Sequence, residues 1–140
     1  MPKKLTFLDA CVLIAAFNLN HKSYKEAFDI LNDPDREFVI TDFLKLELLP
    51  NPTFNNRVDE VNFYKDFFNN AVQALEFTPA KTSEALELAC KYGLTAVDAL
   101  HLQTAIDAKV CEFITVEKTT KPFFRMNNPP FQLTSIHLHE

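Results

Sequence analysis

Four acidic residues stand where apolar segments end or where helices begin, and together they could do metal chemistry. Asp9 separates two apolar runs, LTFL and ACVLIAAF. Glu47 lies among leucines in LKLELL, and Glu117 directly follows the apolar run FITV. Asp98 follows Thr95 by three residues at the start of an apolar helical pattern. An acid between two buried runs, as at Asp9, is costly unless it is paired or binds a metal.

If these carboxylates meet, a bound cation has to offset their charge. Two carboxylates about 4 Å apart repel by roughly 4 kcal/mol at an effective dielectric constant of about 20. Mg²⁺ and Mn²⁺ bind carboxylate oxygens and commonly keep several waters. Such a cation can activate one of those waters for attack on a phosphodiester. The acids therefore predict a divalent metal site, provided that the fold brings them together.

The elements that must position the acids follow an α/β pattern. Short apolar runs rich in β-branched and aromatic residues predict strands, and segments with a helical period lie between them. This alternation predicts an α/β layered domain with a mainly parallel sheet, so the carboxyl ends of the strands share one edge. Asp9 ends the first strand, at the edge where such sheets bind ligands. The predicted strands are residues 5–8, 38–40, 74–77 and 111–116, with a terminal strand or hairpin edge at 131–138.

Capping residues mark the predicted helix ends. Ser23 and Thr95 each precede an acid by three residues, which is the spacing of a capping box. Thr41 or Asp42 can cap the helix that carries Glu47, and Thr82 or Ser83 a later one. Residues 51–57 read as a polar loop after Pro50 and Pro52, and Gly93 stands where a helix needs a left-handed residue at its end.

Composition limits the class of protein. The 140 residues are 47% apolar and predict one domain, 1–140, with no membrane span and no signal peptide. Three cysteines in apolar surroundings predict buried, reduced thiols and a cytoplasmic protein. A single glycine excludes a glycine-rich phosphate loop. The net charge of −5 is unusual for binding nucleic acid, so a polyanionic substrate would need a bound cation and a local basic patch.

The segments FLDACVLI, LKLELL, LTAVDALHLQTA and FITVEK resemble, in order, the four motifs of the PIN domain family, and in particular its VapC-type toxin ribonucleases. The resemblance spans residues 5–118. It implies a three-layer α/β/α sandwich with a mainly parallel central sheet. It also implies a metal-dependent endoribonuclease that uses Mg²⁺ or Mn²⁺ on single-stranded RNA. Many members are toxins of type II toxin–antitoxin pairs, so a cognate antitoxin and a homodimer are the implied partners.

The resemblance assigns catalytic and metal-binding roles to the four acids. Asp9, Glu47 and Asp98 match the core ligands, and Glu117 takes the place of a fourth acid that is more often Asp. Two departures matter. Cys11 stands where the family usually has a small polar residue, so a hydroxyl or amide that could orient Asp9 is missing. Glu117 is one methylene longer than Asp, which puts a second metal position in doubt.

Substrate-binding residues are expected near the fourth motif. Thr115 fits the small hydroxyl residue that the family places there. Lys118, Lys121 and Arg125, with Phe123 and Phe124 between them, form a basic and aromatic cluster. Such a cluster is suited to contact with an RNA backbone and to base stacking.

Each assignment has a structural alternative. In these alternatives, the only role of Asp98 is that of a helix-capping carboxylate. Glu47 is then an exposed helix residue, and Glu117 is a solvated charge at the end of a strand. His101, one turn after Asp98, is either a general base or a buried, hydrogen-bonded histidine. His137 and His139 can form a metal pair or lie unused at the surface.

The function has alternatives as well. A PIN-like domain that has lost efficient catalysis would serve as a binding or scaffold module. An Asp9-based phosphotransferase would need a second Asp where Cys11 stands. For a homodimer, the phenylalanines between Val58 and Phe68 offer an apolar face.

Overall fold

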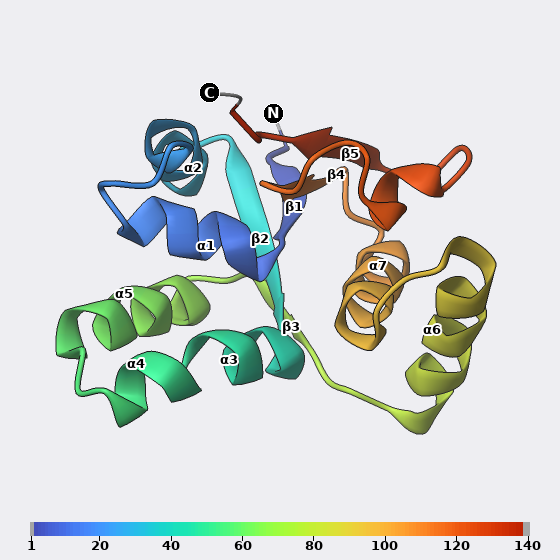
Figure 1. The fold of residues 1–140 in the computed structure, drawn as a ribbon, viewed down its shortest axis with the longest axis horizontal. Coiled ribbons are helices and arrows are strands. Elements are labelled where there is room, and N and C mark those ends of the chain that lie inside the picture. Colours follow the sequence, from blue (N-terminus) through green and yellow to red (C-terminus); the bar gives the residue numbers. More distant parts are fainter. Residues whose placement is uncertain (1, 139–140) are drawn as a thin grey trace.

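The computed structural model describes residues 2–138, and in this range helices flank a five-stranded sheet on both sides (Figure 1). The strands are β1 (Lys4–Leu8), β2 (Arg36–Thr41), β3 (Gln73–Leu75), β4 (Glu112–Thr115) and β5 (Gln132–Ser135). They lie in the order β3-β2-β1-β4-β5, and every neighbouring pair is parallel. The predicted α/β fold with a parallel central sheet is confirmed, and the last segment is a parallel strand.

The helices connect these strands. They are α1 (Ala10–Phe17), α2 (Tyr24–Leu31), α3 (Asp42–Leu48), α4 (Pro50–Phe54), α5 (Val58–Asn69), α6 (Pro79–Tyr92), α7 (Ala96–Ala108) and the short 3-10 helix η1 (Pro122–Arg125). In Figure 1, α1 to α5 lie on one side of the sheet and α6 and α7 on the other. None of the helices in the described range is long and apolar enough to cross a membrane.

Both faces of the central strands are buried. Phe7 and Phe113 belong to a core cluster that includes residues of α6 and α7. Their neighbours Leu8 and Ile114 belong to a second cluster with residues of α1 and α2. Successive side chains of a strand point to opposite faces, so a strand covered on both faces needs a continuous apolar run. This is why β1 and β4 were recognisable in the sequence.

Three predicted helix ends are confirmed. The Thr41 hydroxyl accepts a hydrogen bond from the backbone N–H of Leu44 at 3.0 Å, at the start of α3. The Thr95 hydroxyl accepts one from Asp98 N–H at 3.2 Å, at the start of α7. Gly93 ends α6 with φ +69°, a left-handed conformation that glycine adopts without steric cost.

Two predictions around prolines were wrong. Residues 51–57 were expected to form a loop, but α4 begins at Pro50, where a proline's missing N–H costs nothing. The cap of α6 is Thr78, whose hydroxyl accepts from Lys81 N–H at 3.3 Å, and neither Thr82 nor Ser83. Pro79 starts that helix, so both α4 and α6 begin with a proline.

Two further local predictions failed because tertiary contacts decide them. Ser23 does precede α2, but its hydroxyl donates to the carbonyl of Ile136 at 2.9 Å and makes no capping bond. All three cysteines are free, but only Cys11 is partly buried, whereas Cys90 and Cys111 are exposed.

The aromatic face of α5 packs into the protein's own core. Tyr64 and Phe68 are buried, and the ring of Phe63 lies 5.4 Å from that of Phe17 on α1. Phe63 and Phe67 are only half-buried, so this helix offers a smaller exposed phenylalanine face than the one expected to support a homodimer.

Candidate metal centre at the carboxyl edge of the sheet

Asp9 lies directly after β1 and caps α1, so a strand and a helix fix its backbone together. Its carboxylate oxygen Oδ1 accepts a hydrogen bond from Ala10 N–H at 2.8 Å. The other oxygen, Oδ2, accepts from the Thr115 hydroxyl at 3.1 Å, across from β1 to β4. Asp9 is only 7% exposed. The charged carboxylate is tolerated there because these donors satisfy it.

Cys11 is a further donor to Asp9. Its thiol sulfur lies 3.3 Å from Asp9 Oδ2 and 3.5 Å from the backbone nitrogen of Val116. Burial, followed by the charge of Asp9, raises the pKa of the Cys11 thiol to about 12. The thiol therefore keeps its proton and can donate it. A hydroxyl or amide is absent at this position, as noted from the sequence, and the thiol donates to Asp9 in its place.

Glu47 reaches the same edge from α3. Its side chain is 29% exposed, and its Oε1 lies 2.5 Å from Nε2 of His101 on α7. His101 has no exposed surface, and its ring centroid lies 5.1 Å from that of Phe7. The absence of exposed surface and the contact with Glu47 favour the buried, hydrogen-bonded alternative for this histidine over a general base.

These side chains converge. Asp9, Glu47 and His101 each offer one ligand atom, and the three atoms lie within 4.8 Å of one another. Asp98 lies in the first turn of α7 and does not belong to this group of three. Burial and then the charge of Asp9 raise the pKa of the Asp98 carboxyl, and Glu117 adds to this effect. The four predicted acids thus share one electrostatic environment, although only two of them belong to the close group.

Glu117 lies at the outer side of this edge. Its side chain is 41% exposed and its Oε2 lies 3.8 Å from Nζ of Lys121. Its backbone N–H donates to the Thr115 hydroxyl at 3.0 Å. Thr115 is fully buried. The hydroxyl therefore connects the end of β4 to Asp9, a role that the sequence did not indicate.

Comparison with known proteins agrees with this arrangement. The family model of the PIN domain matches residues 6–118. The chain belongs to the PIN domain family. No curated protein matches it in sequence.

Several solved structures share the fold of this PIN domain. A chain of VapBC2 from Rickettsia felis bound to promoter DNA has a TM-score of 0.68 at 18% identity, covering 94% of this chain and 98% of that one. A toxin–antitoxin complex from Klebsiella pneumoniae gives 0.67 at 17% identity, with the same coverage. DNA-bound VapBC from Salmonella typhimurium gives 0.66 at 13% identity, covering 97% and 99%.

The residues of the basic segment, 118–125, differ in their exposure to solvent. Lys118 and Lys121 are exposed, while Arg125 donates from Nη1 to the carbonyl of Tyr92 at 3.0 Å. Phe123 is only 1% exposed and belongs to the core. The hypothesis that Phe123 stacks on RNA bases was therefore wrong. Of the C-terminal histidines, His139 lies outside the described residues.

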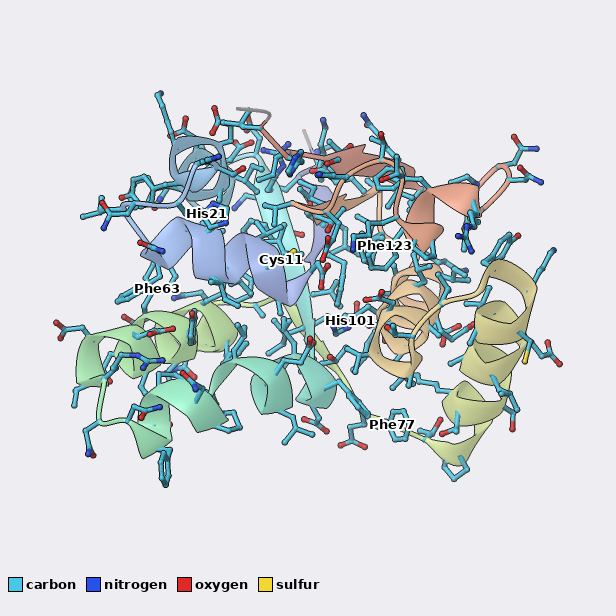
Figure 2. The ribbon with its side chains drawn as sticks, viewed as in Figure 1. Cys11, His21, Phe63, Phe77, His101 and Phe123 are labelled. Carbon is cyan, nitrogen blue, oxygen red and sulfur yellow. The ribbon has the colours of Figure 1, made fainter. Side chains whose placement is uncertain are left out.

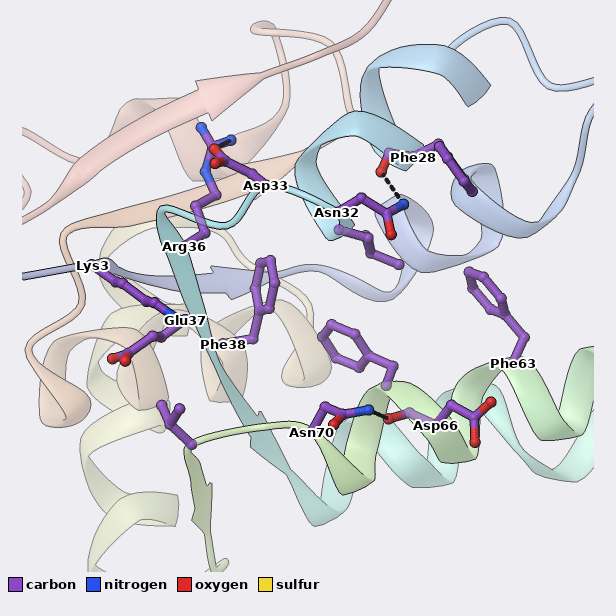
Figure 3. Close-up of a pocket in the computed structure, with 13 residues that line it drawn as sticks. Lys3, Phe28, Asn32, Asp33, Arg36, Glu37, Phe38, Phe63, Asp66 and Asn70 are labelled. Carbon is purple, nitrogen blue, oxygen red and sulfur yellow. Dashed lines mark hydrogen bonds and ion pairs between the residues drawn. The ribbon is translucent and has the colours of Figure 1, made fainter.

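A separate pocket of about 450 Å³ opens elsewhere on the PIN domain (Figure 3). None of the four acids lines it. Its apolar residues include Phe28, Phe38, Phe63 and Phe67, with charged residues of both signs beside them. Its own acidic residues, Asp33, Glu37 and Asp66, lie beside Lys3 and Arg36, so the pocket is lined by different residues from those of the acidic edge.

The donor set of the acidic edge fits a hard divalent cation. Asp9 and Glu47 supply carboxylate oxygens, and Asp98 lies near enough to raise the local negative charge. Mg²⁺ and Mn²⁺ prefer such oxygen ligands. Burial, followed by the negative charge of Asp9, raises the pKa of the Asp98 carboxyl, so a cation bound beside it would favour its ionised form.

Proposed function

We propose that this PIN domain is a metal-dependent endoribonuclease that cleaves single-stranded RNA. The observation that carries the proposal is the convergence of Asp9 and Glu47, with His101, within 4.8 Å at the carboxyl edge of the sheet. Asp9, Glu47 and Asp98 would hold Mg²⁺ or Mn²⁺. Bound there, the cation would supply positive charge for the phosphodiester and a water of lowered pKa for attack on phosphorus.

The side chains around the cation have separate tasks. Thr115 and Cys11 fix the Asp9 carboxylate by donating to Oδ2. Glu117, exposed at the rim, would assist through a second ion or a water. Lys118 and Lys121 are exposed beside it and would contact the RNA backbone. Arg125 would add positive charge from the same segment.

The biological setting is part of the same proposal. We propose that residues 1–140 act as one domain, in the cytoplasm, as the toxin of a type II toxin–antitoxin pair. The solved VapBC structures support this setting through their shared fold. A cognate antitoxin would be the partner, and the pocket of Figure 3 has the apolar lining that a peptide segment could cover. A homodimer is proposed from family membership alone.

The test is cleavage of a mixed single-stranded RNA pool with Mg²⁺ or Mn²⁺. Wild type is compared with Asp98→Asn and Glu117→Gln, and with Asp29→Asn as a control on the exposed face of α2. Cleavage that needs the metal, is lost in Asp98→Asn and survives in Asp29→Asn would support the nuclease. The Glu117→Gln result would decide whether the fourth acid contributes.

The opposite result would favour another function. Folded wild-type protein without metal-dependent cleavage, but with tight metal-independent binding of a protein partner, would indicate a PIN domain that serves as a binding module. The exposed Glu117, which pairs with Lys121, is the feature that fits this alternative.

A further inference from the structure

His101 joins two helices at the acidic edge. It lies on α7, has no exposed surface, and its Nε2 approaches Glu47 Oε1 on α3 at 2.5 Å. Figure 2 shows the ring between α7 and the strands. Among the described residues, His101 is the one hydrogen-bond partner of the Glu47 side chain. Asp9, in contrast, is held by three separate donors.

The hydrogen bond determines which ring nitrogen carries the proton. A carboxylate oxygen only accepts, so the proton of the short bond belongs to Nε2. In the described part of the chain, Nδ1 is buried and has no hydrogen-bond partner. A histidine that binds a metal through one nitrogen usually donates the N–H of its other nitrogen to an acceptor. For His101 that would require a proton on Nδ1, where no acceptor lies.

We infer that His101 is a positioning residue, which holds the Glu47 carboxylate beside Asp9 by donating from Nε2, and that it is not itself a metal ligand. This inference rests on the proposed metal site and specifies how one of its ligands is held. Glu47 is a flexible side chain that is 29% exposed. Without a donor on α7, the Glu47 side chain would lose rotamer freedom each time it bound the cation, and this entropy cost would weaken the binding.

Three substitutions of His101 distinguish the effect of its hydrogen-bond donor from the effect of its side-chain size. In His101→Gln the amide nitrogen can take the place of Nε2 and donate to Glu47. In His101→Asn the amide reaches only to the place of Nδ1. His101→Leu has a similar size and no donor. Gln103→Leu serves as the control, because Gln103 is a buried polar residue of the same helix that bonds to Glu84 instead.

The first measurement is Mn²⁺ affinity, by electron paramagnetic resonance of the free ion, with circular dichroism to establish that each variant is folded. We expect His101→Gln to retain most of the wild-type affinity. His101→Asn and His101→Leu should lose about 10- to 100-fold, the usual effect of removing a partner of a metal ligand. Gln103→Leu should bind as wild type does. Leucine and asparagine variants with wild-type affinity would overturn the inference.

The second measurement asks whether the ring binds the metal. Electron spin echo modulation of the Mn²⁺-loaded wild type should show no directly coordinated ¹⁴N. A nitrogen coupling that disappears in His101→Gln would make His101 a ligand and refute the positioning role. The proposed function has its own control, since wild type that binds Mn²⁺ no better than Asp9→Asn would refute the metal site itself. Binding that is lost in Asp9→Asn but kept in His101→Leu would refute only the role of His101.

Discussion

Replacing Thr115 by valine tests how Asp9 is held. The hydroxyl of Thr115 donates to Asp9 Oδ2 at 3.1 Å and accepts from Glu117 N–H at 3.0 Å, and the residue is fully buried. Valine has nearly the same shape, so Thr115→Val removes both hydrogen bonds without opening a cavity. The change therefore isolates the hydroxyl from the packing around it.

The expected cost follows from the two bonds. A hydrogen bond to a charged acceptor contributes about 1.5–3 kcal/mol, and a neutral one about 0.5–1.5 kcal/mol. Thr115→Val should therefore lower the free energy of unfolding by about 2–4 kcal/mol near neutral pH. Thr115→Ser is the matched control, because it keeps the hydroxyl and loses one methyl group, at a cost of about 0.5–1.5 kcal/mol.

Urea denaturation of the three proteins measures both costs, and Mn²⁺ titration adds a functional readout. Valine should weaken Mn²⁺ binding by about 10- to 100-fold because Asp9 loses the hydroxyl that donates to its Oδ2 from β4. Serine should leave it close to that of wild type. If valine proved no more destabilising than serine and bound Mn²⁺ equally well, the hydroxyl would not be what orients Asp9.

Three other predictions concern Glu112, Gly93 and Cys11. Burial raises the pKa of Glu112, but hydrogen bonds from Arg36 and Thr6 lower it more, so the net pKa is depressed. Its contribution is therefore present above the pKa of the unfolded chain and is lost as the pH falls through the folded pKa. Glu112→Gln should cost about 1–3 kcal/mol near neutral pH, and urea titrations between about pH 6 and pH 2 should show this difference from wild type shrinking. Gly93→Ala should lower the free energy of unfolding by about 1 kcal/mol or more, because φ at this residue is +69° and the added Cβ would lie 2.8 Å from Arg125 Nη1. Thermal melting measures the change, and a variant with the melting midpoint of wild type would contradict the prediction. Near pH 8 a thiol reagent should label the exposed Cys90 and Cys111 quickly and Cys11 slowly, because burial and the charge of Asp9 raise the pKa of the Cys11 thiol to about 12. Mass spectrometry of the labelled peptides measures the three rates, and a Cys11 that reacts as fast as the other two would contradict the prediction.

The sequence was sufficient where a residue's surroundings are local. Asp9 was placed at the carboxyl end of a strand because apolar runs flank it, and β1 does end at Leu8. Gly93 and Thr41 were placed at helix ends because glycine and threonine satisfy particular backbone groups there. Such features depend on a few neighbouring residues, so a single sequence displays them.

Contacts between elements that lie far apart in the chain could not be predicted from the sequence. The pair of Glu47 with His101 joins α3 to α7, and nothing in either segment alone indicates the other. Helix position did suggest a buried histidine, but not its partner. The Ser23 hydroxyl shows the same limit, because its capping spacing was correct while the carbonyl of Ile136 took the hydrogen bond.

The placement of β1 and β4 side by side has a consequence for synthesis of the chain. Thr115 and Asp9 are in contact although 106 residues separate them. At ribosomal rates of about 5–20 residues per second, roughly 5 to 20 s pass between the emergence of these two residues. During that interval Asp9 lacks its donor from β4, and the middle strand of the sheet has a neighbour on one side only. A nascent chain would therefore acquire an ordered acidic edge only after β4 has emerged from the ribosome.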